Sequence, residues 1–81
     1  MLHSMNDQKQ SLAERGTQVY YQLKSKLEKK YDPSDVVFIE PDSGKYFVGK
    51  TTIETLKMAR KQFPRKKFFV AYVGKLAASL K

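Results

Sequence analysis

The stretch VVFIEPDSGKYFVG, residues 36–49, decides the fold class because it places two strand-forming runs on either side of a turn. The runs 36–39 and 45–49 are rich in β-branched and aromatic residues, which favour strands. Between them, Pro41 presets φ for a turn and Gly44 accepts a positive φ. The stretch therefore predicts a β-hairpin.

A helix is predicted upstream of the hairpin, over residues 11–30. Ser11 and Glu14 form the pattern of a capping box at its start, and Asp7 offers a start one turn earlier. The helix is expected to end before Asp32-Pro33, because the residue before a proline is disfavoured in the α region. Its apolar residues recur three or four positions apart and so share one face: Leu12, Gly16, Val19, Tyr20, Leu23, Leu27 and Tyr31.

A second helix, of about twelve residues, is predicted from the capping pattern of Thr51 and Glu54 to Pro64. A third strand is predicted over FFVAYV, residues 68–73, with Gly74 at its end. The segment LAASL, residues 76–80, is expected to add a short helical turn. The expected buried side of the second helix consists of Ile53, Leu56, Ala59 and Phe63.

The predicted fold is α+β, in the order helix, strand, strand, helix, strand. We expect the two helices to pack on one face of a three-stranded sheet. A chain of 81 residues makes a single domain, which we place at residues 11–81. Residues 1–10 are polar and are expected to form a flexible N-terminal arm.

The predicted strands are apolar on both faces, so the second face also needs a cover. Val36 and Phe38 alternate with Val37 and Ile39, and the run 68–73 is apolar throughout. Exposed apolar patches of several hundred Å² usually mark interfaces. We therefore expect a homodimer that buries this face. The alternative is that the N-terminal arm or the C-terminal turn folds over it.

Composition excludes several classes of function. The chain has no cysteine, which excludes disulfides and thiolate zinc sites. It shows no carboxylate pair, catalytic triad or metal-ligand cluster, and its one histidine, His3, lies in the polar arm. We expect no enzyme activity and no cofactor. It also shows no signal peptide and no run of about 20 apolar residues, so we expect a cytoplasmic protein that does not enter a membrane.

Residues 44–51, GKYFVGKT, match the letters of a phosphate-binding loop, G-x-x-x-x-G-K-[ST]. Such a loop must follow a buried strand and curl its amides around a phosphate. Here the middle of the motif, KYFV, favours a strand, and a turn precedes it. A turn glycine, a strand and a helix cap explain the same letters, so we do not expect nucleotide binding.

The positive charge is concentrated in the second half of the chain. The formal net charge is +8; residues 1–44 carry six Lys or Arg and seven acids, whereas residues 45–81 carry ten Lys or Arg and one acid. Six basic residues fall within eleven positions: Lys57, Arg60, Lys61, Arg65, Lys66 and Lys67. We predict that these six form a site for an anionic partner such as nucleic acid, whose phosphates relieve their mutual repulsion.

Two features of this cluster limit the prediction. A basic face can also serve only to keep a small protein soluble, which is the alternative to binding. Lysines outnumber arginines by 13 to 3 in the chain, and arginine is the better group for recognising bases. We therefore expect contacts with a nucleic-acid backbone and no reading of its sequence.

The order of motifs resembles a family of short bacterial proteins, common in cyanobacteria, whose function is not established. The resemblance covers roughly residues 14–80 and rests on R-G-x-x-x-Y in the first helix, a G-x-Y hairpin, a proline after the second helix and a closing V-G-x-x-A-A segment. These motifs correspond here to Arg15, Gly16, Tyr20, Glu40, Ser43, Gly44, Tyr46, Arg60, Pro64, Val73, Gly74, Ala77 and Ala78.

This resemblance implies a non-enzymatic module and supplies no binding residues. Some members look like small partners encoded beside a compact retropepsin-like protease, which implies a protein partner. Relatives often have an acidic residue after the hairpin glycine, where this chain has Lys45. The basic second half is therefore a feature of this chain more than of the family.

Two functions from different classes follow. The first is a small, non-catalytic and dimeric module that binds an anionic partner such as nucleic acid through the six basic residues. The alternative is a protein-partner or antitoxin-like adaptor that docks through an apolar sheet face. Salt separates them, because phosphate contacts weaken steeply with salt and apolar contacts do not.

Overall fold

The computed structural model describes residues 11–75 and the backbone of residues 79–80. Its elements are helix α2 (Leu12–Lys30), strands β1 (Val36–Glu40) and β2 (Lys45–Gly49), helix α3 (Thr52–Gln62), and strands β3 (Phe69–Tyr72) and β4 (Ser79–Leu80). The α+β class and the predicted order of the first five elements are confirmed. The predicted arm, residues 1–10, lies outside the described residues.

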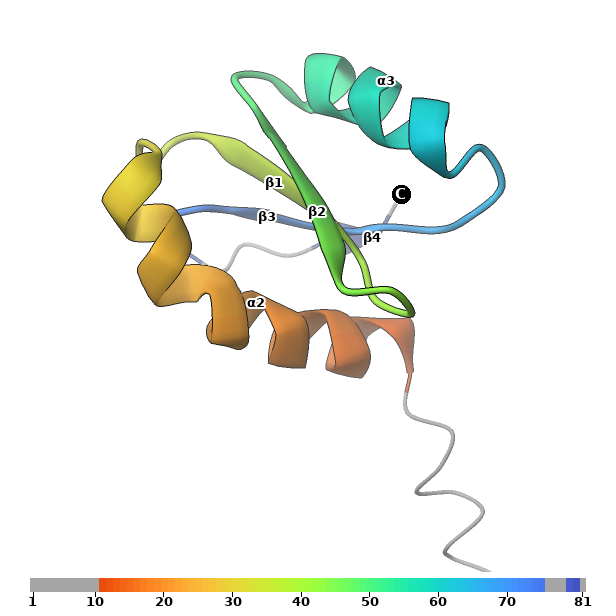
Figure 1. The fold of residues 1–81 in the computed structure, drawn as a ribbon, viewed down its shortest axis with the longest axis horizontal. Coiled ribbons are helices and arrows are strands. Elements are labelled where there is room, and N and C mark those ends of the chain that lie inside the picture. The colour runs from red at the N-terminus through yellow and green to blue at the C-terminus, as the bar shows by residue number, and fades with distance from the viewer. Residues whose placement is uncertain (1–10, 76–78, 81) are drawn as a thin grey trace, which may run out of the picture.

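The sheet is antiparallel, with the strand order β2-β1-β3-β4 (Figure 1). Strand β1 lies in its centre: Phe38 pairs with Phe47 of β2 on one side and with Val70 of β3 on the other. Because β2 and β3 flank β1, the chain crosses from one to the other through α3. Every residue of β1 is buried, which explains its unbroken apolar run.

The two helices cover opposite faces of this sheet, so the prediction that both pack on one face was wrong. Figure 1 shows the sheet between α2 and α3. Residues Val37 and Ile39 of β1 pack in the cluster that contains α2, whereas Val36 and Phe38 pack in the cluster that contains α3. The alternation within one strand therefore serves two cores.

Neither helix in the described part of the chain has the length and the apolar character that a membrane span requires.

This arrangement removes the argument for a dimer. That argument required one apolar sheet face without a helix, and each face has its own. The same correction applies to the adaptor hypothesis, since the sheet face on which a protein partner was to dock is packed within the chain.

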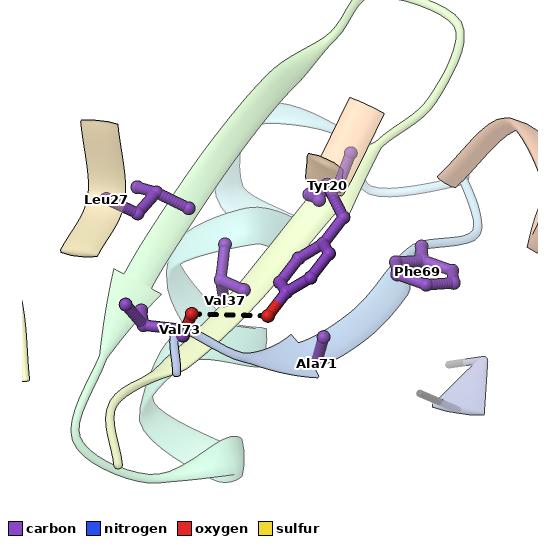
Figure 2. Packing of buried hydrophobic residues seen from close by; sticks show 7 residues of the cluster. Tyr20, Leu27, Val37, Phe69, Ala71 and Val73 are labelled. Carbon is purple, nitrogen blue, oxygen red and sulfur yellow. Dashed lines mark hydrogen bonds between the residues drawn. The ribbon is translucent and has the colours of Figure 1, made fainter. Parts of the chain in front are cut away.

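Figure 2 shows the buried side chains of the core on the α2 face, which depends on a close approach between the helix and β3 at Gly16. A Cβ atom added to Gly16 would lie 2.3 Å from Cγ of the buried Phe69 ring. One turn further along the helix, the Tyr20 hydroxyl lies 2.9 Å from the carbonyl oxygen of Tyr72 and 3.2 Å from that of Val73, and donates to them. Burial raises the pKa of Tyr20 above its usual value of 10.0.

The core on the α3 face is built from aromatic rings. Phe68 is fully buried and lies within 6.5 Å, between ring centroids, of Phe38, Phe47 and Phe63. These tilted and edge-on arrangements are the ones that aromatic quadrupoles favour. The α3 face therefore has a rigid aromatic centre at the C-terminal end of the helix.

The predicted buried side of α3 needs one correction. Ile53 is 68% exposed, and Thr55 is fully buried in its place. The Thr55 hydroxyl donates to the Thr51 carbonyl at 2.7 Å, so its burial leaves no unpaired donor. The absence of a side chain at Gly49 provides the space, because a Cβ there would lie 2.3 Å from Thr55 Oγ1.

The predicted helix starts are confirmed, and the predicted C-terminal turn is not. Ser11 and Glu14 form a complete capping box on α2, and the Thr51 hydroxyl accepts from the Glu54 amide at the start of α3. Residues 79–80 form strand β4 against Phe69 and Val70, where helix was expected, because pairing satisfies the open edge of β3. Residues 76–78 lie outside the described part of the chain.

Candidate functional site

The acidic residues of the described segment all have structural partners. Each of the seven accepts a hydrogen bond or forms an ion pair within residues 11–75: Glu14, Glu28, Asp32, Asp35, Glu40, Asp42 and Glu54. Two of them, Asp35 and Glu40, are buried. Few carboxylates therefore remain to neutralise the surplus of basic residues.

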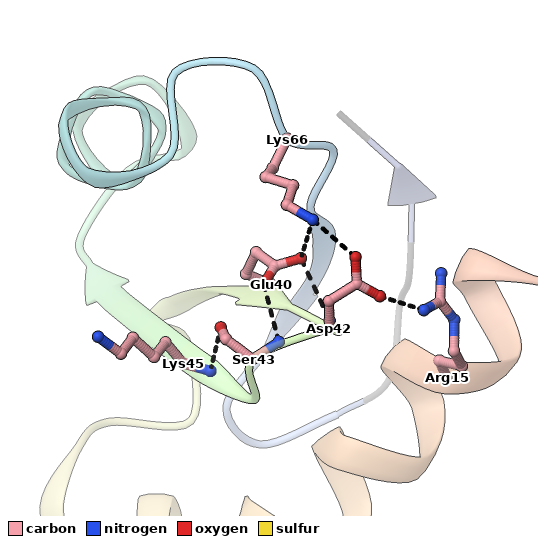
Figure 3. Close-up of polar contacts among 6 residues, drawn as sticks. All are labelled: Arg15, Glu40, Asp42, Ser43, Lys45 and Lys66. Atoms are coloured by element: carbon pink, nitrogen blue, oxygen red, sulfur yellow. Dashed lines mark hydrogen bonds and ion pairs between the residues drawn. The ribbon is translucent and has the colours of Figure 1, made fainter.

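Glu40 is a buried carboxylate that organises the turn between β1 and β2 (Figure 3). Its oxygens accept from the Ser43 amide at 2.9 Å and from the Asp42 amide at 3.2 Å. Gly44 follows with a φ of 77°, a conformation that glycine adopts without strain. The Glu40 side chain thus satisfies turn amides that the hairpin leaves unpaired.

Asp42, on the same turn, joins two other parts of the molecule. Its carboxylate accepts from Arg15 of α2 and, at 2.7 Å, from Lys66 of the loop after α3 (Figure 3). The hydrogen bond from Lys66 and, to a smaller extent, the one from Arg15 lower the pKa of Asp42 below its usual 3.8. The same contact raises the pKa of Lys66 above 10.5. We call this group, Arg15, Asp42 and Lys66, the acidic clasp.

The clasp changes the predicted site. Lys66 lies 3.9 Å from the buried Glu40 carboxylate as well as against Asp42, so two acids neutralise it. Its ammonium is turned toward the hairpin, as Figure 3 shows. The sequence shows that Glu40 and Asp42 flank a turn. It does not show that this turn lies beside the loop that carries Lys66. Lys66 therefore belongs to the structure of the turn.

The phosphate-loop letters have the structural roles that the sequence predicted. Residues Lys45–Gly49 form strand β2, and Thr51 caps α3. Lys50, which would bind phosphate in such a loop, donates instead to the buried Asp35 at 3.1 Å and lies 3.5 Å from Asp32. The hydrogen bond to Asp35 raises the pKa of Lys50 above 10.5.

The remaining five predicted residues are exposed and lie in one continuous segment. Helix α3 carries Lys57, Arg60 and Lys61 on its outer side, and Arg65 and Lys67 follow in the loop. Figure 1 shows this segment on the side of the sheet opposite α2. In the described part of the chain, no carboxylate forms an ion pair with any of the five. We call these five residues the basic surface.

The local structure explains why the basic surface has no acid. Glu54 is the one acidic residue of α3, and its carboxylate accepts from the Lys50 amide at 3.0 Å at the start of the helix. Lys57 and Lys61 lie one turn apart on the same face, with Arg60 beside them. Like charges at this spacing repel one another, and an anion bound between them relieves that repulsion.

Other kinds of site find little support in the structure. Within residues 11–75 and 79–80, no group of three His, Cys, Asp or Glu side chains is placed to hold a metal ion. His3 lies outside the described residues. A hollow of about 390 Å³ is lined by Pro33, Ser34, Tyr72, Gly74 and Lys75.

Comparison with models of protein families, with curated proteins and with solved structures found no match to this chain.

Proposed function

We propose that this protein binds nucleic acid through the basic surface, with contacts to the phosphate backbone. The observation that carries the proposal is the unequal use of carboxylates. Every described acid has a structural partner, yet five neighbouring cations on one segment form no ion pair with a described carboxylate. Their charge is available to a partner without first breaking an internal ion pair.

The chemistry of the surface favours binding without sequence preference. Three of its five residues are lysines, which contact phosphates as flexible point charges. Phosphate contacts position a protein on nucleic acid but carry no sequence information. We therefore expect similar affinity for unrelated sequences of equal length and strandedness.

Release of counterions gives the proposal a quantitative form. If all five cations contact phosphates, the logarithm of the affinity falls with the logarithm of the salt concentration with a slope of about −3.5 for a single strand and about −4.5 for duplex DNA. Between 50 and 200 mM salt, this corresponds to a loss of roughly 100- to 500-fold.

The test is a fluorescence-anisotropy titration of labelled 20-nucleotide single-stranded DNA, single-stranded RNA and duplex DNA with the purified protein. The titrations are repeated at several salt concentrations between 50 and 200 mM. We expect binding at low salt and slopes near the values above. The proposal is wrong if no probe binds at 50 mM salt, or if affinity is independent of salt.

A further inference from the structure

Arg60 differs from the other cations of the basic surface because its guanidinium group is held in place. The group lies over the ring of Phe68, with its central carbon 5.7 Å from the ring centroid. Its Nη1 atom also donates to the carbonyl oxygen of Pro64 at 3.2 Å. A cation–π contact and a hydrogen bond therefore restrict the position of the group.

The support beneath Arg60 is itself rigid. Phe68 is fully buried and packs against the rings of Phe38, Phe47 and Phe63. The Pro64 carbonyl lies just beyond the end of α3, in the turn that leads to the loop of Arg65 and Lys67. Arg60 thus stands where the helix cations and the loop cations meet.

Both contacts leave most of the hydrogen-bonding capacity of Arg60 unused. A guanidinium group has five N–H donors in one plane, and one of them serves Pro64. No described carboxylate forms an ion pair with Arg60, so two parallel N–H groups remain free for the oxygens of one anion.

We infer that Arg60 is the anchoring residue of the basic surface and binds one backbone phosphate through two hydrogen bonds. Lys57, Lys61 and Lys67 attract the phosphates through their charge alone, whereas Arg60 fixes the position of the nucleic-acid strand. This inference rests on the proposed function and adds a geometric requirement to it. An arginine already held in its bound conformation loses less freedom on binding than a free side chain.

The test is the substitution Arg60→Lys, which keeps the charge but removes the planar fork. With labelled single-stranded DNA, we expect affinity to fall by about five- to tenfold, because one bidentate contact is lost. The salt slope should stay equal to that of the unchanged protein. The matched control Arg15→Lys makes the same exchange at an arginine outside the basic surface, where Arg15 pairs with Asp42, and its affinity should stay within about twofold.

The outcomes separate this inference from the proposed function. Salt-dependent binding that is equally strong in Arg60→Lys overturns the anchoring role and leaves the proposed function intact. Binding that is absent or independent of salt in the unchanged protein overturns both. Thermal unfolding of each variant shows whether a weaker affinity reflects a loss of folded protein.

A second measurement tests the contact directly. The chain has three arginines, Arg15, Arg60 and Arg65, so their Nε–H signals can be followed separately by NMR during a titration with a ten-nucleotide oligo(dT). We expect the Arg60 signal to shift most, and the Arg15 signal, from the acidic clasp, to shift least. An Arg60 signal that does not move on saturation contradicts the inference.

Discussion

Helices α2 and α3 cover opposite faces of one sheet, but they differ in how they attach to it and in the charge that they leave outside. Helix α2 approaches β3 closely at Gly16. Its Tyr20 hydroxyl donates to the carbonyl oxygens of Tyr72, at the end of β3, and of Val73. Helix α3 rests on aromatic rings around Phe68. Two cations of α2 have acidic partners: Lys24 pairs with Glu28, and Arg15 pairs with Asp42 of the hairpin turn. No described acid pairs with the outer cations of α3.

The difference shows that acids neutralise two cations of α2, Arg15 and Lys24, whereas no described acid neutralises an outer cation of α3. Both helices carry several basic residues, and a count of lysines does not separate them. Lys26, Lys29 and Lys30 of α2 also form no ion pair with a described carboxylate; Lys26 and Lys30 lie over tyrosine rings, at 5.8 Å and 6.0 Å from the centroids. Those of α3 continue into a loop with two more exposed cations, Arg65 and Lys67.

The largest expected effect comes from Gly16→Ala, which disrupts the attachment of α2. Overpacking against the Phe69 ring costs up to about 3 kcal/mol, while the better helix propensity of alanine returns about 1 kcal/mol. We therefore expect a net loss of about 2 kcal/mol in the free energy of unfolding, measured with urea. Ser25→Ala, at an exposed position of the same helix, is the control and should not destabilise. A Gly16→Ala protein more stable than the original would contradict the close approach.

A smaller effect is expected from Tyr20→Phe, which removes only the hydroxyl that bonds α2 to the end of β3. The loss of its hydrogen bonds to the carbonyls of Tyr72 and Val73 should cost about 1 kcal/mol. The matched control is Tyr21→Phe, because Tyr21 is 56% exposed and its hydroxyl has no partner among the described residues. Its unfolding free energy should change by less than about 0.5 kcal/mol. Equal losses in the two variants would exclude a specific role for the Tyr20 hydroxyl.

The smallest effect is expected from Asp42→Asn, which opens the acidic clasp between the α2 side and the loop after α3. The pKa of Asp42 is lower in the folded protein than its usual 3.8. The clasp therefore stabilises the protein above about pH 4, and this contribution is lost as the pH falls through the folded pKa.

Thermal midpoints of Asp42→Asn and of the unchanged protein should thus differ at pH 7, and the difference should shrink as the pH falls below about 4. Asp32→Asn removes an equal charge from a more exposed pair and should lower the midpoint less. A difference between Asp42→Asn and the unchanged protein that does not shrink as the pH is lowered would show that the ionised carboxylate is not its cause.

Much of the fold was predictable because its signals are local. The Ser11 and Thr51 caps and the turn at Gly44 each depend on a few neighbouring residues, and the helices and the hairpin follow from them. The placement of the helices is not local. The apolar residues on both sides of β1 did indicate two cores. Because the chain is short, we expected a second copy of the protein to cover the second sheet face. Helix α3, in the crossover from β2 to β3, covers that face instead.

The candidate site was predictable to a similar extent. Clustering in the sequence identified five residues that the structure leaves exposed on one segment. It also included Lys66, whose partners Asp42 and Glu40 lie far away in the chain and reach it only through the fold. The contact of Arg60 with the Phe68 ring was not predicted, because it requires the chain to turn back after Pro64.

The central claim is that the α3 side, and not the whole cationic surface, binds nucleic acid. Two triple variants that each remove three positive charges test it most directly: Lys57→Ser with Lys61→Ser and Lys67→Ser, and Lys26→Ser with Lys29→Ser and Lys30→Ser. In the anisotropy titration, the first should weaken the salt slope by about 2 to 3 and lower the affinity at least about tenfold. The second should keep the slope and affinity of the unchanged protein. Equal losses in the two variants would contradict the account.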